Sequence, residues 1–440
     1  MAIAVIGIYT DNGRGLRMRD DIRAWLDAES GLPDQPLRGE FYVDAGIFAA
    51  EMRDVLGRQW LYADHVSRIP RPGDYFLFEV GGESIIVVRR KDGTIGAYFN
   101  VCRHRGSRIC LDRQGSLSSF VCPYHAWTYD LDGALRGAAH MPDDFERRDA
   151  GLMPCHVREL EGLIFLCLAE GEAPDFDALA EIARPYLALN GLAPARLAAR
   201  RSYPTSANWK LVVDNFQECY HCAPAHKLYS SAHSKDKLLA FGAGPGSGPV
   251  DAAERFSGEL ATWRERASAA GTWLDARAEE EDDIRSIWSV GRLPIKAGAL
   301  TESVDGAPVS RLMGRFAEFD GGHSAVAFNV FSYFLASNDH VVMIRFTPRG
   351  VLETDVEFQW FVHPEAEEDV DYEVERLVRV WDVTTTEDKR ITEDNQAGVA
   401  SSRYRPGRFS ALEGRLSTIK RWYLHEMATA SVPSHEELGA

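Results

Sequence analysis

Short hydrophobic runs separated by turn signals dominate the chain after Trp60. Alternation of hydrophobic and polar residues predicts strands, which are separated by Gly81-Gly82 and by Asp92-Gly93, a dipeptide typical of hairpin turns. The predicted strands are residues 75–80, 84–90, 95–101, 117–121, 127–129 and 163–168. This pattern predicts a small all-β domain from about residue 60 to 170, followed by a linker at Ala173-Pro174-Asp175.

Helical spacing alternates with Val- and Phe-rich runs in the remaining chain, so we expect a mixed α and β domain there. Ahead of the β domain, Asp44 is placed to cap a helix that runs to about Leu56. The other predicted helices are residues 17–29, 175–189, 251–270, 372–401 and 416–427, and the predicted strands are residues 325–335, 340–347 and 355–362. We therefore divide the chain into an N-terminal arm and helix (1–59) that pack on the C-terminal domain, the β domain (60–170) and the C-terminal domain (171–440).

The composition is that of a soluble globular protein, with 45% hydrophobic and 26% charged residues. A net charge of -17 argues against a nucleic-acid or anionic-membrane partner, because the electrostatic interaction would be repulsive. No hydrophobic run reaches the ~20 residues of a membrane helix, and residues 1–7 are too short for a signal peptide. Seven cysteines without an export signal favour a reducing cytoplasm with few disulfides. The acidic run at 279–283 is expected to be solvated surface.

Two pairs of Cys and His lie within the predicted β domain. Cys102-Arg103-His104 is followed by 17 residues and then by Cys122-Pro123-Tyr124-His125. Two thiolates and two imidazoles could bind zinc, but the short first pair and the β-rich surroundings differ from a zinc finger. A [2Fe-2S] cluster with two Cys on one iron and two His on the other accounts for both pairs.

A second group of candidate ligands lies between Asn208 and His226. Glu218 and His221 are three residues apart and would share one face of a helix. Pro224 makes a continuous helix unfavourable, so His226 is expected to follow in a turn. Two imidazoles so placed suit iron, zinc or copper, although two histidines alone are weak evidence for a metal site.

The Cys and His pairs carry a resemblance to a known family. Asn100-Val-Cys-Arg-His-Arg-Gly106 and Cys122-Pro-Tyr-His-Ala-Trp-Thr-Tyr-Asp-Leu-Asp-Gly133 resemble the two halves of the Rieske motif. With this domain at its front, the long chain is similar to the large (alpha) subunit of Rieske non-heme iron oxygenases. The resemblance implies an α+β protein: an N-terminal all-β Rieske [2Fe-2S] domain, and a C-terminal catalytic domain with an antiparallel sheet flanked by helices (helix-grip type). Cys102, His104, Cys122 and His125 would hold the cluster.

The same resemblance implies a mononuclear Fe(II) site held by His221, His226 and a carboxylate from a late helix. Asp388 matches that carboxylate, while Glu387, Glu393 and Asp394 are competitors that spacing alone does not exclude; we interpret these three as solvent-facing or capping residues. Three protein ligands on one face of the iron leave the opposite face open for O2.

The resemblance also gives Glu218 a role of its own. A carboxylate three residues before the first His would bridge His221 to His125 of the neighbouring subunit and so define the electron route. Most ring-hydroxylating members have Asp where this chain has Glu218. The bridge requires head-to-tail packing that closes into a ring, so we expect a homotrimer without a small β subunit.

The source of electrons is expected to be another protein. The chain contains no Gly-x-Gly-x-x-Gly after a predicted strand, so NAD(P)H would act only through a separate reductase carrying flavin and an iron–sulfur centre. A protein that only carries electrons is a further hypothesis, disfavoured because His221, His226 and Asp388 are all present.

The substrate class follows from a closer resemblance. Glu218, the run from Asn208 to His226, Asn395-Gln-Ala-Gly-Val and Tyr404-Arg-Pro-Gly look most like the branch that monooxygenates quaternary ammonium compounds, such as glycine betaine, stachydrine and carnitine. Hydroxylation of an aromatic ring or aromatic acid is the alternative. A cationic head would favour aromatic faces and a carboxylate near the iron. Most aromatic residues of the predicted sheet are expected to be core, namely Phe328, Phe331, Tyr333, Phe334, Trp360 and Phe361.

Other segments and residues are assigned ordinary roles. Residues 240–313 match this branch poorly and are predicted to be a lid or insertion that sets specificity. The remaining cysteines are interpreted as buried or incidental thiols, namely Cys110, Cys155, Cys167, Cys219 and Cys222. The remaining histidines are interpreted as surface or satisfied core residues, among them His233, His323 and His340.

Overall fold

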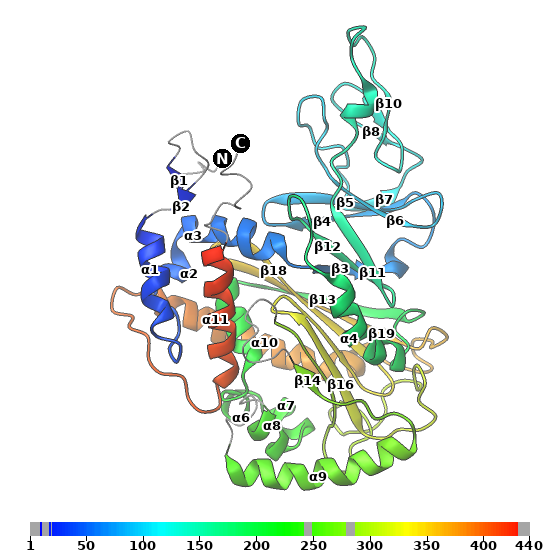
Figure 1. Cartoon of the computed structure of the whole chain (residues 1–440). Helices are drawn as coiled ribbons and strands as arrows, with labels where there is room; N and C mark the ends of the chain where they lie inside the picture. Colours follow the sequence, from blue (N-terminus) through cyan, green and yellow to red (C-terminus); the bar gives the residue numbers. More distant parts are fainter. Residues whose placement is uncertain (1–8, 11–16, 19, 242–248, 279–286, 430–440) are drawn as a thin grey trace. The chain divides into compact units, whose positions relative to one another are not determined.

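A computed structural model of the chain describes residues 9–10, 17–18, 20–241, 249–278 and 287–429 (Figure 1). The predicted acidic run 279–283 and residues 1–7 lie outside the described residues. The chain forms two compact units, one from Gly57 to Phe176 and one that joins the residues before Gly57 to those from Asp177 onward. None of the described helices is both long and hydrophobic enough to cross a bilayer.

The unit from Gly57 to Phe176 consists of short antiparallel strands arranged in three sheets, as the alternating pattern predicts. A four-stranded sheet has the order β6-β5-β4-β7, and two three-stranded sheets have the orders β10-β9-β8 and β11-β12-β3. The strands are β3 (Leu61–His65), β4 (Asp74–Val80), β5 (Glu83–Arg89), β6 (Ile95–Phe99), β7 (Gln114–Ser116), β8 (Phe120–Val121), β9 (Thr128–Tyr129), β10 (Leu135–Gly137), β11 (His156–Leu160) and β12 (Leu163–Cys167). Only the last two residues of the predicted strand 117–121 are extended.

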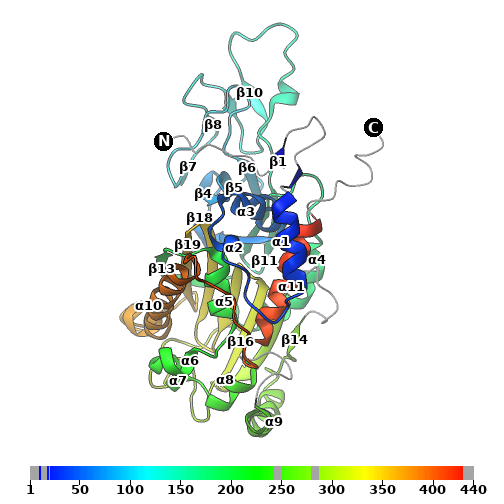
Figure 2. The same cartoon turned by 90° about the vertical axis from the view of Figure 1, so that its left-hand side faces the viewer.

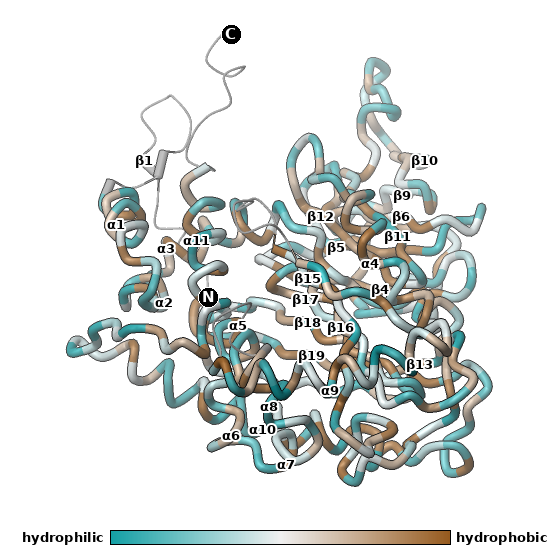
Figure 3. Tube along the Cα trace, turned by 60° about the horizontal axis from the view of Figure 1, so that its bottom comes forward, coloured by the Kyte–Doolittle hydropathy of each residue, from teal (hydrophilic) through white to brown (hydrophobic). Residues whose placement is uncertain are grey.

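The second unit is built on a seven-stranded antiparallel sheet of order β13-β19-β18-β17-β16-β15-β14. Its strands are β13 (Arg196–Thr205), β14 (Arg277–Ala278), β15 (Ser289–Pro294), β16 (Gly322–Asn329), β17 (Ser332–Ala336), β18 (Val341–Gly350) and β19 (Glu353–Val362). Figure 3 shows hydrophobic segments in these central strands, and the first eight residues of β18 are all buried.

One predicted strand of this sheet proves to be a hairpin. The pattern over 325–335 predicted a single strand, but β16 ends at Asn329 and β17 begins at Ser332. The side-chain oxygen of Asn329 accepts the backbone N–H of Phe331 at 2.8 Å, a local bond that favours a turn over a ladder. The six aromatic residues named above are all buried, as predicted.

Helices surround this sheet, and the candidate ligands lie in them or next to their ends (Figure 2). They are α4 (Phe176–Leu189), α5 (Trp209–Gln217), α6 (Cys222–Ala225), α7 (Lys227–Ala232), α8 (Lys235–Phe241), α9 (Val250–Ala269), α10 (Val374–Val399) and α11 (Gly414–Thr429). Phe216 of α5 packs on Tyr333 and Phe346, and Trp381 of α10 packs on Phe358, so both helices cover one face of the sheet.

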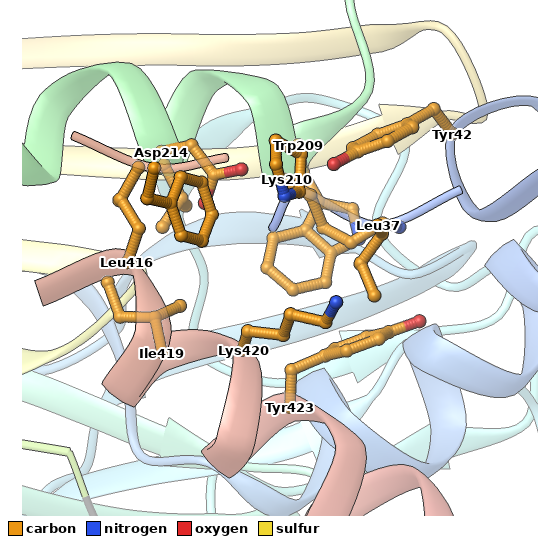
Figure 4. Close-up of a pocket in the computed structure, with 12 residues that line it drawn as sticks. Leu37, Tyr42, Trp209, Lys210, Asp214, Leu416, Ile419, Lys420 and Tyr423 are labelled. Atoms are coloured by element: carbon orange, nitrogen blue, oxygen red, sulfur yellow. The ribbon is translucent and has the colours of Figure 1, made fainter. Parts of the chain in front are cut away.

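The arm before Gly57 belongs to the same unit as the large sheet. It contains α1 (Asp20–Ser30), α2 (Glu40–Val43) and α3 (Ala45–Ala50), and Asp44 caps α3 by accepting the N–H groups of Gly46 and Ile47. The helix predicted to reach Leu56 instead widens into a π-helix over Glu51–Val55. Figure 4 shows the arm residues Leu37 and Tyr42 beside α5 and α11, around a pocket that all three line.

Candidate metal centres

Cys102 and Cys122 start two loops with the same backbone hydrogen bonds. Cys102 N–H donates to Ser107 O at 2.8 Å and Gly106 N–H returns to Cys102 O at 2.9 Å. Cys122 likewise donates to Trp127 O at 2.8 Å and accepts from Ala126 N–H at 3.0 Å. The fourth residue after each Cys has positive φ, which glycine adopts freely at 106 (75°) and Ala126 adopts against its preference (57°).

These loops bring together the four predicted cluster ligands. Both cysteines are buried, whereas His104 and His125 are exposed with their Nδ1 atoms 3.1 Å apart. Trp127 stacks on His104 and Tyr124 stacks on His125. Burial raises the pKa of the Cys102 thiol, which also interacts with Cys122. No three of these donor atoms lie within 4.8 Å of one another in the described chain, so they suit a two-iron cluster better than a single zinc ion.

The second group of candidate ligands comes from three different elements. Asn208 caps α5 by accepting Lys210 N–H at 3.1 Å, and α5 ends at Gln217. Glu218 is extended, so the prediction that it shares a helix face with His221 is wrong. His226 lies between α6 and α7, after the one-turn helix that contains Pro224. Asp388 projects from the middle of α10.

His221, His226 and Asp388 converge although their elements differ. Their candidate ligand atoms lie within 4.8 Å of one another, and this is the one such group of His, Cys, Asp or Glu among the residues that the structure describes. Asp388 Oδ1 lies 2.8 Å from His226 Nε2 and 3.4 Å from His221 Nε2. Two imidazole nitrogens and one carboxylate are the donor set of a non-heme Fe(II) site with open positions.

A carboxylate contacts the other ring nitrogen of each histidine. Glu218 Oε1 lies 2.5 Å from His221 Nδ1, and Glu387 Oε2 lies 2.9 Å from His226 Nδ1. Such contacts turn Nε2 of both rings toward Asp388 and raise the basicity of a metal-binding imidazole. The donor set and its outer partners therefore fit a mononuclear iron.

The same contacts shift the pKa values of His221, His226 and Asp388. Burial disfavours the charged form of His221, but hydrogen bonds to Asp388 and Glu218 outweigh it and raise the pKa of His221 to about 9. The pKa of His226 is raised against the effect of burial by Asp388 and Glu387. Burial also opposes ionisation of Asp388, yet hydrogen bonds to His221 and His226 lower its pKa.

The structure distinguishes among the acidic residues near Asp388. Glu387 was interpreted as a solvent-facing or capping residue, but its carboxylate contacts His226 Nδ1, so this interpretation is wrong. Glu393 instead pairs with Lys389 and accepts Ser206 N–H at 2.9 Å, and neither it nor Asp394 joins the three converging ligands. The sequence carries only a weak signal for a role of Glu387 at the metal site, namely its position next to Asp388.

Cys219, in the loop after Glu218, forms a disulfide with Cys222, the first residue of α6. The interpretation of these two residues as unpaired thiols is therefore wrong, and the bond runs against our expectation for a reducing compartment. The Cys-x-x-Cys spacing did not lead us to predict a disulfide, because we had not predicted the structural context of a redox motif around these residues. Cys110, Cys155 and Cys167 are buried and free, as predicted.

A cavity of about 320 Å³ opens beside His221 and Glu218. Carboxylates line part of it, namely Asp214, Glu218 and Glu413. Burial raises the pKa of Asp214 to about 7. The cavity also has aromatic walls at Tyr42, Tyr404 and Phe409, so its lining suits a positively charged group.

Comparisons with known proteins match both units. Residues 59–153 match the model of the Rieske [2Fe-2S] domain, and residues 192–429 match the ring hydroxylating alpha subunit (catalytic domain). The chain is 36% identical to the glycine betaine monooxygenase oxygenase subunit of Chromohalobacter salexigens, over 91% of this chain and 88% of that protein. It is also 36% identical to the carnitine monooxygenase oxygenase subunit of Acinetobacter pittii, over 45% of this chain and 54% of that protein.

The fold is likewise that of a solved oxygenase. The crystal structure of a quaternary ammonium Rieske monooxygenase aligns with a TM-score of 0.67 at 23% identity, covering 90% of this chain and 97% of that chain. These matches confirm the family predicted from the sequence. The chain belongs to the ring-hydroxylating oxygenase alpha subunits, which join a Rieske [2Fe-2S] domain to the catalytic domain of a mononuclear iron oxygenase.

Proposed function

We propose that this chain is the terminal oxygenase component of a system that removes an N-methyl group from a quaternary ammonium or N-methylated amino-acid-like substrate. The observation that carries the proposal is the convergence of His221, His226 and Asp388, with Glu218 and Glu387 behind the two imidazoles. Relatives named as glycine betaine and carnitine monooxygenases support the substrate class.

In this proposal each set of ligands holds its own cofactor. Cys102, His104, Cys122 and His125 hold the [2Fe-2S] cluster, and His221, His226 and Asp388 hold Fe(II). The mononuclear iron supplies activation of O2 with electrons delivered through the cluster. One oxygen atom enters an N-methyl C–H bond and the other leaves as water, using two electrons and two protons. The N–CH2–OH group then breaks its C–N bond, which releases formaldehyde and the demethylated amine.

The chain's own residues prepare this reaction. Glu218 and Glu387 hold the Nδ1–H groups of His221 and His226, which fixes the ring orientation and leaves both Nε2 atoms facing Asp388. Asp388 offers a carboxylate oxygen to both rings. With only these three side chains as its ligands, a bound iron would keep positions for O2 and substrate.

We further propose that electrons cross between subunits through Glu218, from His125 of one chain to His221 of the next. Inter-subunit electron transfer is described for the quaternary ammonium Rieske monooxygenase of known structure. Charge supports the proposal: exposed Arg103 and Arg105 flank His104 on the Rieske loop, whereas carboxylates line the cavity at Glu218. A closed head-to-tail ring, here a homotrimer without a small β subunit, satisfies every such contact.

The electrons come from a separate reductase with flavin and its own iron–sulfur centre, which oxidises NAD(P)H. Because metabolism supplies NAD(P)H, we propose that the reaction takes place in the cytoplasm. Family membership supports a separate reductase, and the identity of its cofactors is part of the proposal.

The substrate proposal is tested by product analysis with a surrogate reductase. Glycine betaine should yield formaldehyde and dimethylglycine in equal amounts, whereas benzoate and other aromatic acids should yield no hydroxylated product. Hydroxylated aromatics without formaldehyde from any betaine would favour the alternative, oxidation of an aromatic ring.

Iron analysis separates an oxygenase from a pure electron carrier. We expect three irons per chain, two in the cluster and one at the triad, and the third should be lost in His221→Ala. Two irons per fully loaded wild-type chain would show that the triad does not hold iron.

A further inference from the structure

A buried cluster of polar side chains surrounds Glu302, in the segment 240–313 whose role the sequence left open. Glu302 is 3% exposed. Its Oε2 accepts the indole N–H of Trp381 at 2.7 Å, and its Oε1 lies 2.8 Å from His233 Nε2. His323 Nε2 lies 3.8 Å from Oε2. We call Glu302, His233, His323 and Trp381 the Glu302 cluster.

The Glu302 cluster is attached to the same two elements that carry the metal ligands. His226 precedes α7 and His233 follows it, seven residues later, while Trp381 and Asp388 are seven residues apart on α10. Seven helical residues span about 10 Å. Tyr229 of α7 packs on both His233 and Trp381, and the charges of Glu302 and Asp388 both raise its pKa beyond the effect of burial. Glu302 is therefore separated from the His221–His226–Asp388 triad by a distance comparable with the length of a small molecule.

Glu302 is a buried carboxylate that no Lys or Arg side chain of the described residues contacts directly. No Lys or Arg of the described chain lies within 4.0 Å of it, and its near partners are an indole and two imidazoles. Burial lowers the pKa of His323 to about 3 and lowers that of His233, so both rings are neutral at pH 7. Lys237, whose pKa burial lowers to about 8 against the charge of Glu302, is farther away.

Two buried ring nitrogens of this cluster also lack partners. His233 Nδ1 and His323 Nε2 form no hydrogen bond within the described residues. His340 Nδ1 next to the cluster lies 2.8 Å from Asp339 Oδ1, and the charges of Asp339 and Glu302 raise the pKa of His340 against the effect of burial. Buried charges are normally paired, and an unpaired one is costly. Within the described chain Glu302 thus has no Lys or Arg in direct contact, and Lys237 and His340 act on it only from farther away. A buried carboxylate in this position suits a ligand that brings its own positive charge.

We propose that Glu302 is the specificity-determining charge for the cationic head of the substrate, placed between the Glu302 cluster and the His221–His226–Asp388 triad. The aromatic rings of Tyr229 and Trp381 lie next to each other beside Glu302 and suit a quaternary ammonium group, which needs charge and apolar contact but no hydrogen bond. This inference rests on the proposed function. It assigns to Glu302, in a described part of segment 240–313, the role of supplying the charge that selects a cation over a neutral group of the same shape.

A metal ion is a weaker explanation of the cluster. His233, His323 and Glu302 do not meet the distance at which three donors converge on one ion, which His221, His226 and Asp388 do meet within the described chain. Trp381 also occupies one carboxylate oxygen through its N–H.

The test compares glycine betaine with 3,3-dimethylbutanoate, in which carbon replaces the charged nitrogen and the shape is kept. Binding of each to the anaerobic, iron-loaded protein is measured by calorimetry. Wild type should prefer glycine betaine, and Glu302→Gln should lower that preference at least about tenfold. Affinity for 3,3-dimethylbutanoate should stay nearly constant. A wild-type preference retained in Glu302→Gln would overturn the inference.

Matched variants separate this role from simple structural support. Glu259→Gln alters another carboxylate of the same segment, which accepts the Ser234 hydroxyl, and should leave the preference unchanged. If Glu302→Gln does not fold, Glu302→Asp serves: the displaced charge should give an intermediate preference, and a wild-type value would overturn the inference. Equal weakening of both ligands would show a structural role only. Wild type that binds no quaternary ammonium compound would instead refute the proposed function.

Discussion

At the scale of single residues, the histidines of the triad use their two ring nitrogens differently. Nε2 of each faces Asp388, and Nδ1 of each contacts a glutamate. The two glutamates therefore help to define the metal site, because a carboxylate bound to Nδ1 leaves Nε2 as the nitrogen that can bind a metal. Glu218 was singled out by the family resemblance, whereas Glu387 became visible only in three dimensions.

Glu387→Gln should weaken retention of the mononuclear iron by about 10- to 100-fold, because the amide holds His226 Nδ1–H less strongly than a carboxylate does. The measurement is iron content after timed exposure to a chelator. Absorbance of the Rieske cluster should not change. Glu393→Gln, on the same helix but paired with Lys389, is the control and should retain iron like wild type. Equal iron loss in both variants would contradict a specific role for Glu387.

Tyr129 is a second residue with a defined electronic effect. Its hydroxyl lies 3.4 Å from Cys102 Sγ and accepts Arg103 N–H at 3.2 Å. A hydrogen bond to a cluster thiolate stabilises the reduced, more negative state. Tyr129→Phe should therefore lower the reduction potential of the cluster, by an amount on the order of tens of millivolts, in a spectroscopic redox titration. An unchanged or higher potential would show that the hydroxyl does not donate to the sulfur.

At the scale of elements, a buried glutamate ties the arm to two helices of the catalytic unit. Glu51 accepts the indole N–H of Trp209 at 2.8 Å and contacts Lys210 Nζ and the Tyr423 hydroxyl, both at 2.5 Å. Trp209 and Lys210 (Figure 4) are the first two residues of α5, and Glu218 and His221 follow soon after its end. Burial lowers the pKa of Lys210, so this lysine depends on Glu51 to remain charged.

Glu51→Ala should destabilise the catalytic unit by about 3–5 kcal/mol, because it leaves the Lys210 ammonium buried and unpaired. Differential scanning calorimetry should show a lower transition for this unit, while Rieske absorbance reports the other unit separately. Arg201→Ala, which removes an exposed pair with Glu375, is the control and should cost less than about 1 kcal/mol. A shift no larger than that of the control would contradict the stabilising role of Glu51.

Helices and strands were predicted well where the sequence carries one dominant physical signal, such as a long helical period. The helices that became α4, α9, α10 and α11 have boundaries within about two residues of the predicted ones, because long helical periods are hard to mistake. Strand β13, at one edge of the large sheet, and strand β15, next to the other edge, were missed, since a partly exposed strand lacks a continuous hydrophobic run.

Contacts between distant segments were beyond the sequence alone. Glu302 lies 69 residues from His233 and 79 from Trp381, so no local spacing could connect them. Glu218 was predicted to meet His221 through a helix, yet the contact is made by an extended residue and a turn. The pairing of Glu218 with His221 was therefore predicted correctly, but the helical geometry that we expected to join them was wrong.

The disulfide of the ligand loop gives a direct chemical test. Alkylation of the unfolded, cluster-free chain without reductant should label the five free cysteines, and prior reduction should expose all seven. Mass spectrometry should locate the protected pair at Cys219 and Cys222. Cys222→Ser should leave Cys219 free to react, which serves as the control. Seven labelled cysteines without reduction would show that the loop carries two thiols instead.

At the scale of the whole molecule, the proposed electron route makes each active site the joint property of two subunits. A chain with Cys102→Ala lacks a complete cluster but keeps its triad, whereas a chain with Asp388→Ala keeps its cluster and lacks the iron ligand. Each variant alone should be inactive. If electrons pass only from one subunit to the next, mixed oligomers should regain activity wherever an intact cluster faces an intact triad.

The recovered activity has a definite size in a closed head-to-tail ring. With equal, random mixing, about half of the subunits have an intact triad and about half of those face an intact cluster, so roughly one quarter of wild-type activity is expected. The measurement is formaldehyde release from glycine betaine after co-expression with two different affinity tags. Adding Glu218→Gln to the triad-intact chain should abolish the recovery. If electrons instead moved within one subunit, no mixture would exceed the sum of its inactive parts, and the acidic cavity beside Glu218 would need another explanation.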